Sequence, residues 1–324
     1  MRRLMLITAI AVGLLQKPHV VLAQTDNYPN KTVRLIVPFS PGGSVDIIAR
    51  LLAPKLTGNL GQSVVVDNRA GASGNIAAEL VARAAPDGYT ILLITTTHAV
   101  NATLIRRLPY DSINDFAPVS LLVSQPNILV VRSGAAAQSV QDLVASARQK
   151  PNAISFASGG NGSSPHLSGE LFALAAGVML THVPYKSAGP GIVDVLGGHV
   201  DMIFAGPLDV ISHIKSGRLR VLAVAGAQRS TALPDVPTMA EAGYAGVETG
   251  TWYGILAPAA TPPRVVKTLN SAFSQAVRSA ETSTRLAALG VNVVARGPDE
   301  FRSFMHTEID KWRRVVTDAK IPVN

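Results

Sequence analysis

Four glycine-rich loops contain the residues best suited to bind a ligand. They occupy residues 38–46, 68–74, 158–166 and 184–190, and each follows a short apolar run and leads toward a helix-like segment. Glycine lets the backbone turn sharply and approach a ligand closely. The first turn of a helix leaves N–H groups unpaired and partly positive. Loops of this kind favour a small anion, above all a carboxylate.

Several side chains near these loops could add to the backbone amides. Asp46 falls in a first helical turn, where a carboxylate more often partners the helix dipole than a ligand. Arg69 could pair with a substrate or brace the backbone. Tyr185 and Lys186 could line the site or lie at its rim. Residues 95–98 end a strand with three threonines and a histidine, whose polar groups could face a ligand or bond within the loop.

Catalytic and metal-binding patterns are weak. Residues 71–74 do not form a nucleophile elbow, because Asn75 stands where the second glycine belongs. There is no Walker loop, and no Gly-x-Gly-x-x-Gly follows a predicted strand. The histidines at 98, 166, 182, 199, 213 and 306 lack metal-ligand spacing. We therefore predict no catalytic residue, metal or cofactor, and keep a secreted hydrolase using Ser73 or Ser163 with a histidine as the weakest alternative.

The elements around these loops predict an α/β fold. Strands are expected at 33–38, 63–67 and 90–95, with helices at 44–56 and 74–84 between them. This alternation is typical of a mostly parallel sheet with helices on both faces. Such sheets bind ligands beyond the carboxyl ends of their strands.

The alternation restarts near residue 138, which predicts a second lobe. An apolar segment at 117–131 is long enough to cross between the lobes, and a strand at 219–225 is the expected return. We place the first lobe at residues 24–124 and 227–324 and the second at 125–226, with a cleft that closes by hinge motion. The remaining expected helices are 140–148, 165–176, 191–196, 263–280 and 298–319, and the remaining strands are 153–157, 180–183, 201–204, 252–257 and 291–295.

The N-terminus has the features of a secretory leader. Arg2 and Arg3 precede an apolar stretch at 4–15, and small residues lead to an expected cleavage after Ala23. A membrane anchor is disfavoured, because spanning needs about 20 apolar residues. The chain has no cysteine, so neither a lipidated cysteine nor a disulfide scaffold is expected. In a bacterium this indicates the periplasm.

Composition supports two globular lobes. The chain has 324 residues, of which 47% are hydrophobic and 15% charged, so extensive burial is expected. The formal charge is +8, and loss of Arg2, Arg3 and Lys17 with the leader leaves 8 − 3 = +5. This charge could steer anions, although solubility is the favoured role. Scattered basic residues and 5% aromatics argue against nucleic acid as a partner.

Seven segments in order along the chain resemble the Bug family, the extracytoplasmic solute receptors of tripartite tricarboxylate transporters. The resemblance implies a two-lobed Venus-flytrap fold like that of periplasmic binding proteins, a monomer, and a small carboxylate held largely by backbone amides and hydroxyls. It also implies delivery to a membrane permease, whereas a sensory receptor would have the same pocket. The matching segments are 28–46, 68–76, 85–90, 155–166, 183–190, 234–238 and 252–258.

The resemblance also implies which residues line the cleft. The family more often has Pro-Gly-Ala-Gly-Gly at residues 70–74, where this chain has Ala-Gly-Ala-Ser-Gly. Ser73 adds a hydroxyl there, which could change ligand preference. The expected ligand-binding residues are Phe39, Ser40, Gly42, Gly43, Ser44, Asp46, Ser73, Thr96, Thr97, His98, Ser158, Gly159, Asn161, Gly162, Ser163, His166, Tyr185, Lys186, Asp201 and Phe204.

Overall fold

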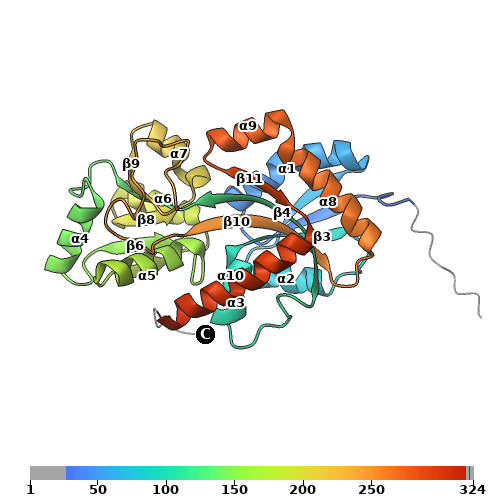
Figure 1. Ribbon diagram of the computed structural model, residues 1–324, viewed down its shortest axis with the longest axis horizontal. Coiled ribbons are helices and arrows are strands. Elements are labelled where there is room, and N and C mark those ends of the chain that lie inside the picture. The colour runs from blue at the N-terminus through green and yellow to red at the C-terminus, as the bar shows by residue number, and fades with distance from the viewer. Residues whose placement is uncertain (1–26, 319–320, 322–324) are drawn as a thin grey trace, which may run out of the picture.

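The computed structural model describes residues 27–318 and residue 321, and it folds into two α/β lobes joined by long strands (Figure 1). The predicted leader at residues 1–23 and its cleavage site lie outside the described residues. Each lobe has one sheet with helices on both faces. The predicted two-lobed α/β fold is therefore confirmed.

The first lobe is built on a six-stranded sheet in the order β11-β4-β10-β3-β1-β2. β1 pairs in parallel with β2 and β3, and β10 pairs antiparallel with β3 and β4. Helices α1 and α8 pack on one face, and α2, α3 and α10 on the other. Its elements are β1 Val33–Val37, α1 Ser44–Leu60, β2 Val64–Asn68, the 3-10 turn η1 Ala72–Gly74, α2 Asn75–Ala82, β3 Thr90–Thr95, α3 Thr96–Leu104, β4 Phe116–Pro126, β10 Gly250–Pro258, α8 Pro263–Arg278, α9 Ala280–Ala288, β11 Asn292–Arg296 and α10 Pro298–Asp318.

The second lobe has a five-stranded sheet in the order β7-β6-β8-β5-β9. β6 pairs in parallel with β7 and β8, and β5 pairs antiparallel with β8 and β9. Helices α4 and α5 pack on one face, and α6 and α7 on the other. Its elements are β5 Ile128–Arg132, α4 Val140–Gln149, β6 Ser155–Ser158, α5 Ser164–Ala176, β7 Thr181–Pro184, α6 Ala188–Gly197, β8 Met202–Ala205, α7 Pro207–Lys215 and β9 Leu219–Val224.

The chain crosses between the lobes at Asn127 and returns at Thr249. Asn127 lies between β4 and β5, and its backbone N–H donates to Thr249 O at 3.0 Å. The return was predicted in residues 219–225, but β9 belongs entirely to the second sheet. Residues 227–249, predicted in the first lobe, stay with the second because Met239 and Val247 pack into its core.

Three helices, α3, α7 and α9, were not predicted, and two of them, α3 and α7, begin at the cleft. Most residues of α3 are buried, so it lacks the alternating polar face that indicates a helix. Helix α7 is short and begins at Pro207, directly after its N-cap Gly206. Both begin immediately after a strand, at the carboxyl end of a sheet, which is where the two lobes face each other.

Candidate ligand-binding site

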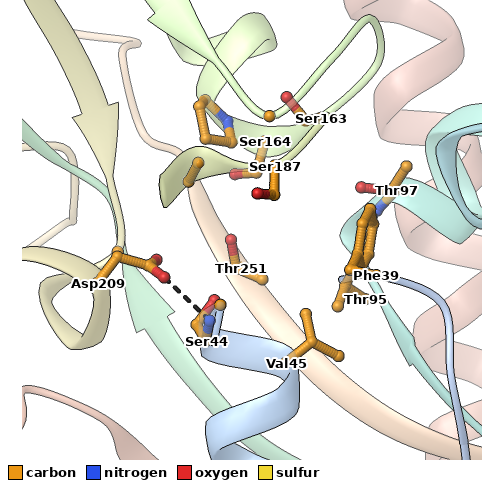
Figure 2. Close-up of a pocket in the computed structure, with 15 residues that line it drawn as sticks. Phe39, Ser44, Val45, Thr95, Thr97, Ser163, Ser164, Ser187, Asp209 and Thr251 are labelled. Carbon is orange, nitrogen blue, oxygen red and sulfur yellow. Dashed lines mark hydrogen bonds between the residues drawn. The ribbon is translucent and has the colours of Figure 1, made fainter. Parts of the chain in front are cut away.

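A cavity lies between the two lobes, and we call it the inner cavity (Figure 2). Its volume, including the part that is open to solvent, is about 570 Å³, and its walls are mainly glycine, hydroxyl and small apolar side chains. The lining comes from both lobes and from the return strand β10. The lining residues are Phe39, Gly43, Ser44, Val45, Thr95, Thr97, Gly159, Ser163, Ser164, Pro165, Ser187, Ala188, Gly206, Asp209 and Thr251.

Five helices begin at this cavity. The N-cap residues of α1, α3, α5, α6 and α7 all belong to its lining, and each helix follows the carboxyl end of a strand. Each helix N-terminus carries a partial positive charge of roughly half an electron charge. Their convergence makes the cavity suited to an anion without a basic side chain. These N-caps are Gly43, Thr95, Ser163, Ser187 and Gly206.

Two of the five N-termini are capped by their own side chains. The Thr95 hydroxyl accepts from Thr97 N at 3.4 Å, and the Ser163 hydroxyl accepts from His166 N at 3.5 Å. The Ser163 hydroxyl itself donates to Gly160 O at 2.7 Å. Helices α3 and α5 therefore offer a ligand fewer free amides than their position suggests.

The N-termini of α1 and α7 are occupied by other parts of the protein. In α1, Ser44 N donates to Asp209 Oδ1 across the cleft at 3.0 Å. In α7, Leu208 N donates to Gln125 Oε1 at 3.3 Å. By contrast, Ser187 makes no side-chain cap at the start of α6. The backbone amides of α6 are thus best placed to receive a ligand.

Asp209 brings an acidic group to this positive cavity. It lies in the first turn of α7 and reaches toward α1 in Figure 2. Burial raises the pKa of Asp209 to about 6, against the hydrogen bonds from the backbone and hydroxyl of Ser44, which lower it. The carboxylate is therefore mostly charged at neutral pH and readily protonated just below it.

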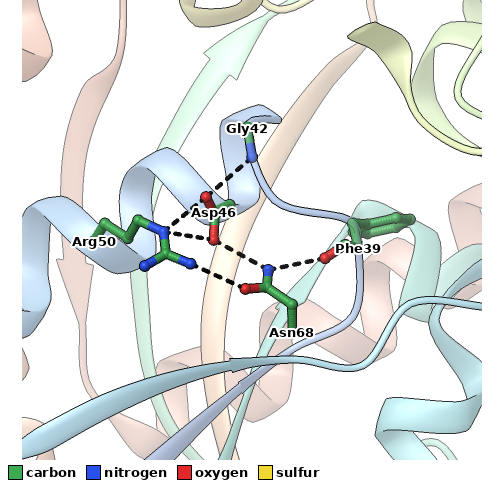
Figure 3. Close-up of polar contacts among 5 residues, drawn as sticks. All are labelled: Phe39, Gly42, Asp46, Arg50 and Asn68. Carbon is green, nitrogen blue, oxygen red and sulfur yellow. Dashed lines mark hydrogen bonds and ion pairs between the residues drawn. The ribbon is translucent and has the colours of Figure 1, made fainter. Parts of the chain in front are cut away.

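The loop at 38–46 is held in place by Asp46 (Figure 3). The Asp46 carboxylate accepts from Gly42 N at 3.0 Å, Arg50 Nε at 2.9 Å and Asn68 Nδ2 at 3.0 Å. Burial would raise the pKa of Asp46, but these hydrogen bonds and the Arg50 charge keep it below its usual value. Asp46 positions the loop and does not line the cavity.

A second space, the outer cleft, continues from the inner cavity past Phe39 and Gly159, which line both. It includes four further predicted residues, Ser40, Ser73, Tyr185 and Lys186. Ser73 has a left-handed backbone with φ of 53°, and its hydroxyl donates to Asn161 O of the other lobe at 3.2 Å. The Tyr185 hydroxyl donates to Asp194 Oδ2 at 2.5 Å, and burial together with this bond raises the pKa of Tyr185 to about 12.

Several predicted residues lie behind the cavity wall and shape it. The Thr96 hydroxyl donates to Gly250 O at 3.3 Å and accepts from Trp252 N at 3.2 Å, which ties α3 to the return crossing. His98 is buried beside Tyr110, and burial lowers the pKa of His98 to about 4, so the ring is neutral. Six further predicted residues line neither space: Asp46, Ser158, Gly162 and His166, which are buried behind the wall, and Gly42 and Asn161, which are exposed.

Asp201 and Phe204 do not lie at the site. Asp201 precedes β8, so it lies at the amino end of the strand, where its carboxylate accepts from Ser155 N and Oγ, both at 2.7 Å. Phe204 lies within β8 and packs in the core against Phe172. Both were expected from the family resemblance, but Asp201 lies at the end of β8 away from the cavity, and the Phe204 side chain points into the core.

Sequence reasoning missed several lining residues. Ser187 and Ala188 begin α6, one residue beyond the predicted pair Tyr185 and Lys186. Gly206 and Asp209 follow β8, so the rule that marked the other loops could have found them. Thr95, one of the polar residues noted at 95–98, also lines the cavity, and the further lining residues that were not predicted are Val45, Ser164, Pro165 and Thr251.

The described residues offer little for catalysis. The hydroxyls of Ser73 and Ser163 donate to backbone carbonyls rather than to a histidine. The Ser158 hydroxyl lies 2.6 Å from His182 Nε2, but Ser158 is fully buried and so cannot contact a substrate in this structure. No group of three His, Asp or Glu residues able to hold a metal ion occurs within 27–318, and in that range no helix is long and apolar enough to span a membrane.

Comparison with known proteins decides the family. Residues 48–321 match the model of the tripartite tricarboxylate transporter family receptor, TctC. Protein BugT of Bordetella pertussis is 41% identical over 300 residues, which cover 91% of this chain and 92% of BugT. The chain belongs to the TctC family. It is a periplasmic-type solute-binding receptor and not an enzyme, which dismisses the hydrolase alternative.

Solved structures of TctC relatives share the whole fold. The periplasmic binding protein BugD is 33% identical with a TM-score of 0.87, covering 91% of this chain and 99% of BugD. An R. palustris protein with adipate is 38% identical with a TM-score of 0.88, covering 91% and 99%. MatC from Rhodopseudomonas palustris with bound malate is 32% identical with a TM-score of 0.85, covering 89% and 100%.

Proposed function

We propose that this protein captures a small carboxylated compound in the periplasm and delivers it, as a monomer, to the membrane permease of a tripartite tricarboxylate transporter. The observation that carries the proposal is the convergence of five helix N-termini on one cavity between the lobes. The adipate and malate bound to two relatives are both small carboxylates. The leader would direct export and be cleaved near Ala23.

The carboxylate would bind at the second lobe. The start of α6 has no side-chain cap, and the Ser163 and Ser164 side chains line the cavity beside it. Amides at a helix N-terminus donate to an anion at about 2.7–2.9 Å and stabilise it through the helix dipole. The rest of the ligand would extend within the inner cavity toward the first-lobe wall, where Asp209 meets Ser44.

Binding would be coupled to closure of the lobes. The second-lobe residues Leu167 and Leu208 pack into hydrophobic clusters of the first lobe. Hydrogen bonds donated by Ser44 N, Ser73 Oγ and Leu208 N also join the two lobes. A ligand contacting both walls binds this arrangement better than an open one, so it shifts the population toward closure.

Two measurements test the proposal. Native mass spectrometry of freshly purified protein should detect a bound small acid. Thermal unfolding with a panel of mono-, di- and tricarboxylates and aromatic acids should identify ligands, because a ligand at 100 times its Kd adds about 2.7 kcal/mol to stability. The absence of any carboxylate from both experiments would contradict the proposed function.

Transport and sensing require a separate experiment, because both would use the same closed receptor. Cross-linking the liganded protein in its native membranes should capture a multi-span permease. Capture of a signalling protein instead would leave the binding function intact and contradict delivery. Edman sequencing of protein from the periplasmic fraction should begin near residue 24 if export occurs as proposed.

A further inference from the structure

Asp209 is unusual among the residues that line the inner cavity. It is the one ionisable side chain in a lining otherwise made of glycine, proline, hydroxyl and apolar residues. It comes from the first turn of α7 in the second lobe, and Ser44 N of α1 donates to its Oδ1 at 3.0 Å. The close-up in Figure 2 shows this contact at the edge of the cavity.

The negative charge of Asp209 has no cation beside it. No ion pair to Asp209 is found among the described residues, and the nearby polar groups are neutral. Tyr253 lies behind it, with its hydroxyl receiving a hydrogen bond from Gln125 Nε2 at 2.7 Å. Asp209 is partly buried, and its donors are the backbone and the hydroxyl of Ser44, both of which are neutral. A partly buried carboxylate is stabilised further by a charged donor. The part of a ligand that reaches Asp209 can supply such a donor.

Asp209 also limits what the first lobe can bind. Its carboxylate occupies Ser44 N, the amide through which α1 would otherwise receive an anion. A ligand with carboxylates at both ends would place one on the α6 amides and bring the other toward Asp209, where like charges repel. A ligand with a carboxylate at one end and a donor at the other satisfies both walls.

We infer that Asp209 determines ligand class, favouring a small carboxylate that also carries a hydrogen-bond donor, best an ammonium group, over a dicarboxylate of the same length. This rests on the proposed function, because it requires the carboxylate to bind in the inner cavity. The recognition is a charge-assisted hydrogen bond between the donor and the Asp209 carboxylate.

A matched ligand series tests this inference by calorimetry at pH 7.5. The first set is 3-aminopropanoate, 3-hydroxypropanoate, butanoate and succinate, which keep one carboxylate and change the other end. A second set, one methylene longer, contains 4-aminobutanoate, 4-hydroxybutanoate, pentanoate and glutarate. Wild type should bind the amino acid of at least one set about tenfold or more tightly than the dicarboxylate.

Two variants complete the design. Asp209→Asn keeps an oxygen that can accept from Ser44 N but removes the charge, so the preference for the amino acid should fall below about threefold. Asp235→Asn makes the same charge change at an exposed position of the second lobe and should leave the preference unchanged. Unfolding of both variants without ligand shows whether the fold is retained.

The outcomes separate this inference from the proposed function. Tighter binding of succinate or glutarate by wild type, or an unchanged preference in Asp209→Asn, would overturn the role of Asp209. If neither set binds, the chemical groups of the molecule identified by native mass spectrometry test the inference instead. A carboxylate without an N–H or O–H donor would overturn the inference alone, and a ligand without a carboxylate would overturn both.

Discussion

The two lobes contribute to the cavity in different ways. The second lobe brings the N-termini of α5, α6 and α7, whereas the first brings those of α1 and α3. The Thr95 side chain caps α3, and Asp209 of the second lobe occupies the first amide of α1. Only the second lobe therefore retains a helix start, that of α6, with neither a side-chain cap nor a partner across the cleft among the described residues. This difference indicates that the second lobe holds the anion and the first lobe closes over it.

The largest effect is expected from occupying the α6 N-terminus. In Ser187→Asp the new carboxylate can accept from the α6 amides, as an N-cap Asp commonly does, so it competes with the ligand at the same donors. Affinity should fall about 100-fold or more, equal to about 2.7 kcal/mol, while unfolding of the free protein changes little. Calorimetry with the ligand found by native mass spectrometry measures the loss.

The control for this change is Ser279→Asp at the N-cap of α9, which lies outside both cavity linings. It introduces the same group at a helix start and should leave affinity as in wild type. Unimpaired binding by Ser187→Asp would place the anion elsewhere.

Asp209 makes the contact between the lobes dependent on pH. Its folded pKa of about 6 lies above its ordinary value of 3.8, so the folded protein binds this proton more tightly than the unfolded chain. Stability from this group is complete below pH 4, falls between pH 4 and 6, and stays low above that range. By about 1.36 kcal/mol per pKa unit, the loss is up to about 3 kcal/mol.

Asp209→Asn cannot ionise, so it should be more stable than wild type at pH 8, and the advantage should shrink toward pH 4. Urea unfolding at pH 4, 6 and 8 measures this difference, with Asp235→Asn as the charge control. If Asp209→Asn also loses stability as the pH rises, as wild type does, another group is responsible for the pH dependence.

Substitution of one glycine from each wall of the cavity compares the two lobes directly. A Cβ on Gly159 would lie 3.3 Å from Ala188 N at the start of α6, whereas a Cβ on Gly43 would meet nothing within 4 Å. Gly159→Ala should therefore weaken binding about tenfold by displacing the α6 amides, and Gly43→Ala by no more than about twofold. Calorimetry compares the two, and equal losses would mean that both walls hold the anion alike.

The smallest effect is expected from a wedge between the lobes. Gly162 has φ of 75°, and a Cβ there would lie 2.9 Å from Leu104 Cδ1 of α3, across the cleft. The Leu104 side chain can move, so the contact should cost little. Relative to a variant that carries only the backbone strain, Gly162→Ala should weaken binding about threefold to fivefold. Small-angle X-ray scattering should show a slightly larger radius of gyration.

Gly177→Ala is the control for strain. Gly177 has φ of 60°, but a Cβ there meets nothing within 4 Å, so the variant carries the left-handed strain without the wedge. If both variants alter affinity and size alike, the contact between Gly162 and α3 has no part in closure.

The sequence was informative where local features decide the structure. The loops at 38–46 and 158–166 could be recognised from the sequence, because the glycines, the apolar strand before each loop and the helix after it are adjacent in the chain. In the same way, the alternation of strands and helices along the chain predicted two sheets. Helices α3 and α7 were missed because their burial or shortness hides the helical period.

Features that depend on distant contacts could not be read from the sequence. Asp209 meets Ser44 from 165 positions away, so its place after β8 could indicate the cavity but nothing local indicates its partner. The return crossing was placed too early because the apolar strand β9 was taken for it, and only tertiary contacts, such as those of Met239 and Val247, show that residues 227–249 stay with the second lobe. Asp201 was expected from the family resemblance, and only the structure shows that it lies at the amino end of β8.

The position of the ligand carboxylate is the most direct test of the division between the lobes. A crystal structure of the complex with the native ligand should show its carboxylate oxygens about 2.7–3.1 Å from the backbone N of Ala188 or Gly189 at the start of α6. A carboxylate bound instead at Ser44 N of α1, with Asp209 displaced, would contradict the account.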